Sequence, residues 1–286
     1  MNPTNISELK NYFRARGLKP KDYMGQNFLI DEDALKAIVE AADLKSSDIA
    51  LEVGPGLGVL TKQLAEKCKE VWAVEKDAKL VQILKTKLHK ENNIHLINDD
   101  ILRFHVDKHI KGDYKVVANI PYYLTSKLLQ NFLELNNPPK LMVLMIQKEV
   151  GERVVAKAGE LSVLGISVQI YSDPEIVAVQ IPDQVRDGFG EKRIPLIVPK
   201  TSFWPVPKVD SVILRIIPKN KYPEIQDKKL FFQIVKTAFA GKRKQIHNTL
   251  KNLEALNQAG IDPKTRPQDI TIEKWIRLYL VLVDRL

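Results

Sequence analysis

The stretch Ile49-Ala50-Leu51-Glu52-Val53-Gly54-Pro55-Gly56-Leu57-Gly58 decides the fold class, because a short apolar run ends directly in a loop with three glycines. Such a run, followed by a turn and an amphipathic stretch, is typical of a strand that leads into a helix. Glycines let the backbone approach a ligand closely, since no Cβ intervenes. The N-terminus of the next helix favours negative charge. The sequence therefore predicts a ligand-binding turn between a buried strand and a helix.

Outward from this turn, short apolar runs alternate with longer amphipathic stretches, which is the spacing of repeated βαβ units. We therefore expect an α/β fold with a Rossmann-like, mostly parallel sheet that is buried on both faces. Two runs without a helix between them, residues 176–181 and 209–217, predict an antiparallel edge pair. The other expected strands are Ile49–Val53, Val71–Glu75, Ile94–Ile97, Lys115–Ala118 and Leu141–Ile146, and the expected helices are Leu60–Lys67, Ala78–His89, Ser126–Leu135 and Leu161–Tyr171.

Near the C-terminus the alternation stops and only helical periodicity continues. Helices are expected at Leu230–Ala240, Lys244–Ala259 and Ile272–Leu286, separated by glycine and proline breakers. We therefore predict two domains, an α/β domain of residues 1–217 and a small all-α domain of residues 218–286.

The composition indicates a globular chain, with 286 residues of which 44% are hydrophobic and 28% are charged. The only cysteine is Cys68, so no internal disulfide can form, which fits a reducing compartment. Residues 1–11 lack the apolar core of a signal peptide, and the longest clear apolar run, Leu141–Ile146, is too short to cross a bilayer. We expect a cytoplasmic protein. The histidines and Cys68 show no metal-ligand spacing, so no metal is expected.

Positive charge is concentrated towards the ends of the chain, whose net charge is +9. Residues 1–25 carry five Lys and Arg against two Asp and Glu, and residues 218–286 carry fourteen against seven. A basic distribution of this kind is typical of proteins that bind polyanions, and it also occurs as a solubilising surface. Charge alone therefore leaves both interpretations open.

Acidic residues end the next two expected strands. Glu75 lies 21 positions after Gly54, where a carboxylate can accept both hydroxyls of a ribose. Asp100 follows the third strand and can accept the amine of an adenine. A dinucleotide fingerprint would place its third glycine at Val59, whereas here it falls at Gly58. We therefore expect a ligand that contains a ribose, which is either NAD or S-adenosylmethionine. The spacing of the glycines argues against NAD.

The turn Asn119-Ile120-Pro121-Tyr122 follows the fourth expected strand, and its residue types suit chemistry at an adenine amine. That amine is a poor nucleophile, because its lone pair is delocalised into the ring. The Asn119 side-chain oxygen and the Ile120 carbonyl can each accept one amine hydrogen, in bonds that strengthen as positive charge develops on nitrogen. Pro121 fixes the turn and donates no N–H. Tyr122 offers a face on which an extruded base can stack. The turn therefore predicts catalysis by alignment, without a strong general base.

These motifs together resemble the ribosomal RNA adenine dimethyltransferase family, and the resemblance runs over most of the chain. Gly25–Leu29 resembles the family's N-terminal segment that folds over the cofactor, and Phe203–Ser211 resembles its F-x-P-x-P-K-V-D-S element. Phe239–Asn248 resembles the basic stretch of its C-terminal domain. The resemblance implies a class I S-adenosylmethionine-dependent methyltransferase domain, a helical RNA-binding domain, and S-adenosylmethionine as the cofactor.

The resemblance also implies roles for single residues. Phe203 would meet the face of the target base opposite Tyr122, so the implied catalytic residues are Asn119, Ile120, Pro121, Tyr122 and Phe203. The implied cofactor contacts are Gln26, Asn27, Leu29, Gly54, Gly56, Gly58, Glu75, Lys76, Asp100, Ile101 and Asn119. The implied RNA contacts are Lys208, Lys242, Arg243 and Lys244. The last three would also fit a solvated helix start, but the extra positive charge of the region favours RNA.

Two branches of the family compete as the better match. One dimethylates two adjacent adenines in the 3′-terminal hairpin of 16S rRNA in an immature small subunit, and the other is a resistance methylase that acts on 23S rRNA. Leu57 and the run Pro207–Ser211 favour the first branch, since the second usually has a polar residue in place of Leu57. A mitochondrial transcription factor branch keeps the fold but works partly as a binder. We expect a monomeric enzyme of the first branch.

Two other function classes stay open. The basic ends of the chain also fit a ribosome-assembly factor that binds RNA and whose enzyme site is secondary. A Rossmann-like sheet alone would fit a nucleotide-dependent oxidoreductase. Val59 and the Asn119–Tyr122 turn argue against that class of enzyme. The chain also departs from the family's pattern at residues 182–202, an inserted loop that either touches RNA phosphate or is a neutral surface insertion.

Overall fold

A computed structural model describes residues 4–180, 193–241 and 244–284, and the chain forms two compact units. The inserted loop predicted from the sequence therefore lies largely outside the described residues. Unit 1 comprises Met1–Gly151 and Glu175–Pro218, and unit 2 comprises Glu152–Pro174 and Lys219–Leu286.

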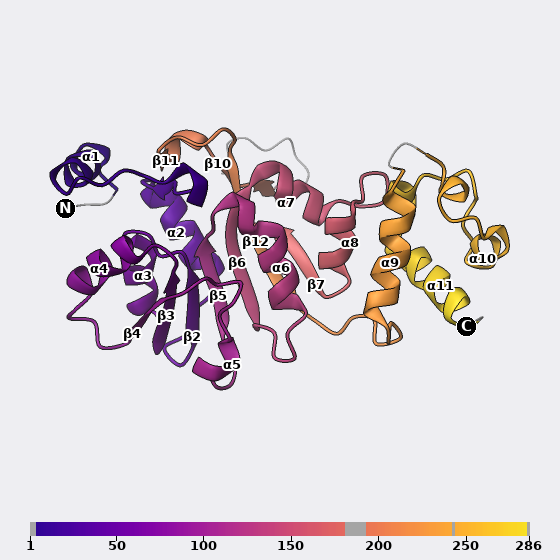
Figure 1. The fold of residues 1–286 in the computed structure, drawn as a ribbon, viewed down its shortest axis with the longest axis horizontal. Helices are drawn as coiled ribbons and strands as arrows, with labels where there is room; N and C mark the ends of the chain where they lie inside the picture. Colours follow the sequence, from indigo (N-terminus) through magenta and orange to yellow (C-terminus); the bar gives the residue numbers. More distant parts are fainter. Residues whose placement is uncertain (1–3, 181–192, 242–243, 285–286) are drawn as a thin grey trace. The chain divides into compact units, whose positions relative to one another are not determined.

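The sheet of unit 1 is the Rossmann-like sheet that the sequence predicts, with parallel strands in the order β4-β3-β2-β5-β6 (Figure 1). Strand β12 pairs antiparallel with β6 and with β10, and β7 also pairs with β12. The bounds are β2 (Ile49–Val53), β3 (Glu70–Glu75), β4 (Ile94–Asn98), β5 (Lys115–Asn119), β6 (Leu141–Gln147), β7 (Ser172–Ile176, which begins in unit 2), β10 (Ile197–Val198) and β12 (Ser211–Pro218).

Strand β2 lies in the middle of the sheet, between β3 and β5. Val53 is in register with Val74 of β3, and Leu51 is in register with Val116 of β5. The chain passes outward from β2 through β3 to β4 and then returns to the other side of β2 for β5. The C-terminal ends of β2 and β5 therefore meet where the strand order reverses, which is the place where open α/β sheets bind ligands.

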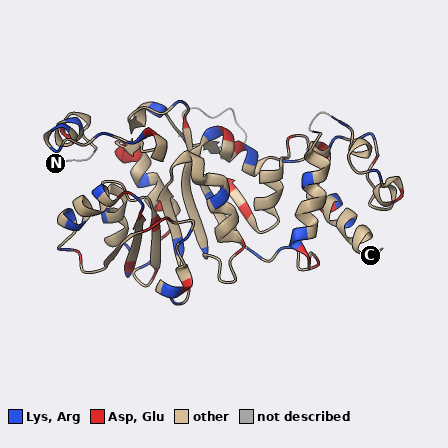
Figure 2. Ribbon diagram, viewed as in Figure 1, with Lys and Arg blue, Asp and Glu red and all other residues tan. Residues whose placement is uncertain are grey.

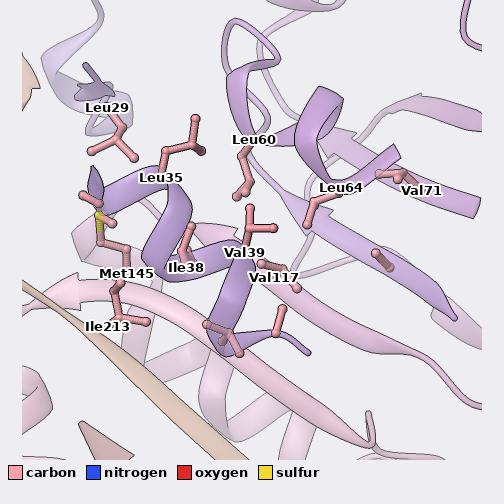
Figure 3. Packing of buried hydrophobic residues seen from close by; sticks show 14 of the residues in the cluster. Leu29, Leu35, Ile38, Val39, Leu60, Leu64, Val71, Val117, Met145 and Ile213 are labelled. Atoms are coloured by element: carbon pink, nitrogen blue, oxygen red, sulfur yellow. The ribbon is translucent and has the colours of Figure 1, made fainter. Parts of the chain in front are cut away.

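Helices α2 (Glu32–Ala41) and α3 (Val59–Ala65) cover one face of this sheet. Figure 3 shows Ile38 and Leu64 from these helices among Val117, Met145 and Ile213 of the strands, and all five side chains are fully buried. Each such side chain contributes roughly 1.5–3 kcal/mol relative to an exposed one. This packing holds the strand ends in fixed positions.

The remaining elements of unit 1 connect or flank the sheet. Helices α1 and α2 were not predicted from the sequence. The prediction of a single strand over residues 176–181 is wrong, because β8 leaves the main sheet and pairs with β9 instead. These elements are α1 (Ile6–Ala15), η1 (Asp22–Met24), β1 (Phe28–Leu29), α4 (Ala78–Lys87), α5 (Val106–His109), η2 (Tyr122–Leu124), α6 (Thr125–Leu133), α7 (Lys148–Val155, which runs into unit 2), β8 (Ala178–Gln180), β9 (Arg193–Pro195), η4 (Lys200–Ser202) and β11 (Phe203–Trp204).

Unit 2 is built on helices around a buried Trp275. Residues 152–174, which the sequence reading placed in the first domain, belong to unit 2, because Ile166 and Ile170 are buried in the same cluster as Phe231 and Trp275. The helices are α8 (Val163–Gln169), α9 (Lys228–Phe239), α10 (Leu253–Gln258) and α11 (Ile272–Val283), with short turns η5 (Ile246–Asn248) and η6 (Pro267–Asp269).

The expected helix over residues 244–259 is wrong in its first half. The N–H of Ile246 donates to the carbonyl of Thr265 at 2.8 Å, which commits this stretch to a turn. Helix α10 begins only after Asn252, whose side chain accepts the N–H of Ala255 at 3.0 Å. Asparagine competes for backbone hydrogen bonds and therefore favours a helix cap over a helix interior.

Candidate active site

A cavity opens at the C-terminal ends of the parallel strands in unit 1. It holds about 1180 Å³ when its open mouth is included. The turn after β2 lines it together with the residues that follow β3, β4 and β5. Most of the site residues predicted from the sequence therefore lie around one cavity, namely Gln26, Asn27, Leu29, Gly54, Gly56, Glu75, Lys76, Asp100, Ile101, Asn119, Ile120, Pro121 and Tyr122.

The glycine turn is fixed to the end of β3. Gly54 and Gly56 have φ angles of +66° and +61°, in the left-handed region that favours glycine. The N–H of Gly56 donates to Oε2 of Glu75 at 3.1 Å. A Cβ on Gly56 would lie 3.4 Å from the ring of Phe28, so a side chain would narrow the space above the turn.

Glu75 has the acceptor geometry that a ribose requires. Its Oε1 accepts the N–H of Asp77 at 2.8 Å, and its Oε2 accepts the N–H of Gly56. Each carboxylate oxygen has two acceptor positions, so these two hydrogen bonds leave acceptor capacity for a further donor. The side chain is 7% exposed, and burial raises the pKa of Glu75. The residues present therefore fit a ligand with two neighbouring hydroxyls.

Asp100 and Lys76 form an ion pair beside the cavity. Lys76 Nζ lies 2.8 Å from Oδ2 of Asp100, and Oδ1 of Asp100 accepts the N–H of Leu102 at 3.1 Å. The hydrogen bond from Lys76 lowers the pKa of Asp100, so this carboxylate stays ionised and can accept an adenine amine. Lys76 lines the cavity as predicted, and its ammonium group orients Asp100.

The Asn119–Tyr122 turn follows β5, which lies on the other side of β2 from β3. The side-chain amide of Asn119 donates to the carbonyl of Asn27 at 3.4 Å, which leaves the side-chain oxygen as an acceptor. The hydroxyl of Tyr122 lies 2.8 Å from Oγ of Ser211, a contact that orients the ring. The turn therefore presents an acceptor and an aromatic face to the same space as Glu75.

Phe203 does not reach this space, which corrects the prediction that it meets the target base. It pairs with Leu29 across the short ladder of β1 and β11. The residue is 1% exposed and lies in the same hydrophobic cluster as Leu29 and Ile38. The alternation of a two-residue strand decides which of Phe203 and Trp204 points inward, and the structure buries Phe203.

Two of the predicted RNA contacts are described, and neither of them lines the cavity. Lys208 and Lys244 are exposed. Lys242 and Arg243 lie outside the described residues.

Gly58, a predicted cofactor contact, also does not line the cavity. It is the N-cap residue of α3. It has a φ of +79°, and a Cβ there would lie 2.8 Å from Cδ2 of the fully buried Leu84. We expect Gly58→Ala to destabilise the protein by about 2–5 kcal/mol, from about 1–2 for the left-handed backbone and about 1–3 for overpacking. Urea unfolding measures this. Gly112→Ala is the control, because it has a φ of +87° but open space around the Cβ; equal losses in both variants would contradict the clash with Leu84.

Glu52 is a cavity residue that the sequence reading placed only in a strand. It is 2% exposed, and its Oε2 has no hydrogen-bond partner among the described residues. Burial raises the pKa of Glu52 to about 8, and the neighbouring Thr61 hydroxyl, which itself makes no well-formed hydrogen bond in the described structure, offsets this only in part. The sequence did contain a signal for this residue, because an acidic residue stands inside a strand that is predicted to be buried on both faces.

The described residues contain no group of three or more His, Cys, Asp and Glu side chains that could hold a metal ion. Within the same parts of the chain, no helix has the length and apolar character needed to span a bilayer.

The sheet order, the glycine turn, the strand-end acids and the Asn119–Tyr122 turn together define a class I S-adenosylmethionine-dependent methyltransferase. The family model for ribosomal RNA adenine dimethylase matches residues 17–284, and the chain belongs to this family of rRNA adenine methyltransferases.

Comparisons with known proteins agree with this family. The chain is 38% identical over 290 residues to Ribosomal RNA small subunit methyltransferase A of Dehalococcoides mccartyi (strain CBDB1), covering 97% of this chain and 94% of that protein. A protein of the same name from Latilactobacillus sakei is 36% identical, with 96% and 93% covered.

Two solved structures are similar over most of their length. A dimethyladenosine transferase from Plasmodium falciparum has a TM-score of 0.75 and 26% identity, with 90% of this chain and 98% of that chain covered. The 23S rRNA methyltransferase ErmE has a TM-score of 0.69 and 27% identity, with 90% and 100% covered.

Proposed function

We propose that this protein dimethylates the N6 amines of two adjacent adenines in the 3′-terminal hairpin of 16S rRNA. Its substrate would be an immature small ribosomal subunit in the cytoplasm, and it would act as a monomer. The observation that carries the proposal is the shared cavity of Glu75 and Asn119, which places a ribose acceptor and an amine acceptor around one space. The small-subunit name of the relatives at 36–38% identity supports 16S rRNA as the target.

The chain's own residues would hold S-adenosylmethionine along the strand ends. Glu75 would accept the ribose hydroxyls, Asp100 the adenine amine, and the Gly54–Gly56 turn would allow close backbone approach. When bound, the cofactor supplies a methyl group on a sulfonium that is already activated for displacement. The protein therefore needs to align an acceptor rather than to activate a donor.

The Asn119–Tyr122 turn would align that acceptor. The side-chain oxygen of Asn119 and the carbonyl of Ile120 would each accept one hydrogen of the adenine amine, and both bonds gain strength as charge develops on nitrogen. Stacking on Tyr122 would contribute on the order of 1–3 kcal/mol to holding the base outside its helix. The Tyr122–Ser211 contact at 2.8 Å keeps that ring in place beforehand.

Basic residues on both units would bind the RNA backbone. Figure 2 shows Lys and Arg on α1 of unit 1 and on α9 of unit 2. Lys10 and Arg14 of α1 are exposed, as are Lys208 and Lys244. Contacts of this kind position the substrate without reading its sequence. Lys242 and Arg243, which the resemblance adds, remain part of the proposal.

The test is methylation of defined ribosomal particles. Purified enzyme and radiolabelled S-adenosylmethionine are incubated with small subunits that lack the modification and, separately, with 23S rRNA. We expect dimethyladenosine in the 3′-terminal hairpin of 16S rRNA and none in 23S rRNA. Label in 23S rRNA alone would favour the second candidate, a resistance-type methyltransferase, which the similarity to ErmE motivates. Label in neither RNA would contradict the proposal.

A further inference from the structure

Residues 21–29 form a strap that lines one side of the cavity and is held at both ends. Met24, Gly25 and Phe28 of this strap are lining residues together with the predicted Gln26, Asn27 and Leu29. At the far end, β1 pairs with β11, and Oγ of Ser202 donates to Oδ2 of Asp31 at 2.6 Å. The end of the strap near Lys21 is held by polar contacts to Asp77.

Asp77 binds two side chains of the strap. Its Oδ2 lies 2.8 Å from Nζ of Lys21 and accepts a hydrogen bond from Nε2 of Gln26 at 2.9 Å. The amide oxygen of Gln26 accepts the backbone N–H of Lys21 at 2.9 Å, so both polar ends of the Gln26 side chain are engaged with protein. Gln26 therefore lines the cavity as predicted, but its amide serves this network.

The same aspartate is connected to the ribose acceptor. Its backbone N–H donates to Oε1 of Glu75 at 2.8 Å, and its Oδ1 caps α4 by accepting the N–H of Lys79 at 3.0 Å. Asp77 is only 4% exposed. Burial raises the pKa of Asp77, but the hydrogen bonds from Lys21 and Gln26 outweigh it and the net pKa is lowered. A buried and ionised carboxylate of this kind is stable only while its cationic partner is in place.

We propose that Asp77 is a positioning residue that latches the strap over the cofactor site through Lys21 and Gln26. The latch acts before S-adenosylmethionine binds and so reduces the ordering that binding would otherwise require. The inference rests on the proposed location of the cofactor in this cavity and does not depend on which RNA is the substrate.

The Asp77→Asn variant separates the latch from the helix cap. If the asparagine oxygen keeps the cap to Lys79, its NH₂ group takes the place of Oδ2 and faces the donors of Lys21 and Gln26. Lys21→Met removes the cation and keeps most of the side-chain stem. Asp113→Asn is the matched control, because Asp113 forms an exposed 3.2 Å ion pair with Lys140 and does not line the cavity within the described residues.

We expect Asp77→Asn and Lys21→Met each to weaken S-adenosylmethionine binding by on the order of 10-fold or more in calorimetric titration of the full-length protein. The KM for S-adenosylmethionine should rise by more than kcat falls. In hydrogen exchange, the amides of residues 21–29 should exchange faster in both variants without cofactor. The double variant should bind no more weakly than Asp77→Asn alone, because the two changes break one interaction. Asp113→Asn should match the wild type.

Additive losses in the double variant, or wild-type affinity in Asp77→Asn, would overturn the latch. So would faster exchange of the strap with unchanged affinity, because the strap would then be irrelevant to binding. A wild-type protein that fails to bind S-adenosylmethionine would instead contradict the proposed cofactor site itself. Thermal unfolding of each variant shows whether the fold is retained.

Discussion

Replacing Asn119 by alanine is expected to lower kcat for adenine methylation by on the order of 100- to 1000-fold, by analogy with the loss of one acceptor or donor that acts in a transition state. The side-chain oxygen of Asn119 is proposed to accept an amine hydrogen, and that bond strengthens only as charge develops on nitrogen. Its amide makes one long contact, 3.4 Å to the carbonyl of Asn27, so the strap loses little. Single-turnover methylation of unmodified small subunits measures the effect.

Asn137→Ala is the control for this experiment. The Asn137 side chain donates to the carbonyl of Gly112 at 3.1 Å on the exposed surface, so the variant removes a comparable amide away from the site. We expect it to methylate at the wild-type rate. A rate within a few-fold of wild type for Asn119→Ala would remove the amine-acceptor role from this residue.

The same variant separates catalysis from a role in ribosome assembly. If Asn119→Ala abolishes methylation yet restores small-subunit assembly in a strain that lacks the gene, the protein acts there as an RNA-binding factor. If both are lost while RNA binding persists, methylation itself is needed.

The sheet and the strand-end residues were predictable because parallel strands impose their own geometry. The C-terminal ends of β2, β3, β4 and β5 meet at one edge, whatever the exact register. Glu75, Asp100 and Asn119 therefore had to face a common space once their strands were recognised. Short apolar runs between amphipathic stretches carry that information locally.

The network around Asp77 was not predictable in this way. Gln26 and Asp77 are 51 residues apart, and the strap has no hydrophobic periodicity that would indicate its path. In the sequence, Asp77 is indistinguishable from an ordinary helix-capping aspartate, and it does cap α4. The burial of Phe203 depends on the register of a two-residue ladder, and a ladder that short leaves no alternation in the sequence.

The prediction for the helical unit was wrong at residues 244–259 for a related reason. Apolar residues at helical spacing continue through residues 244–259, but the partner of Ile246 is the carbonyl of Thr265. A contact between distant residues thus overrides the local helical preference there.

The Glu52→Gln variant is expected to be more stable than the wild type at neutral and alkaline pH. Burial raises the pKa of Glu52 to about 8, from 4.5 for an ordinary glutamate. Between these two values the native protein keeps a proton that the unfolded chain releases. The unfolded chain then binds fewer protons, so the stability contributed at this site falls as pH rises through that window. Glutamine does not titrate, and the variant avoids this loss.

The expected gain follows from the size of the pKa difference. Each unit is worth about 1.4 kcal/mol. The variant should therefore be close to wild type near pH 4.5, more stable by on the order of 3 kcal/mol at pH 7, and by up to about 5 kcal/mol above pH 8. The side chain is 2% exposed, so solvent screening does little to reduce these values.

Urea unfolding followed by circular dichroism at pH 5, 7 and 8.5, without cofactor, measures the difference between the two proteins. Glu91→Gln, at an exposed position, controls for the loss of one acidic group. Parallel pH profiles for Glu52→Gln and wild type would mean that Glu52 is ionised in the native protein. In that case the buried Oε2, which lacks a partner in the described structure, would have to be paired by water or by a bound cation.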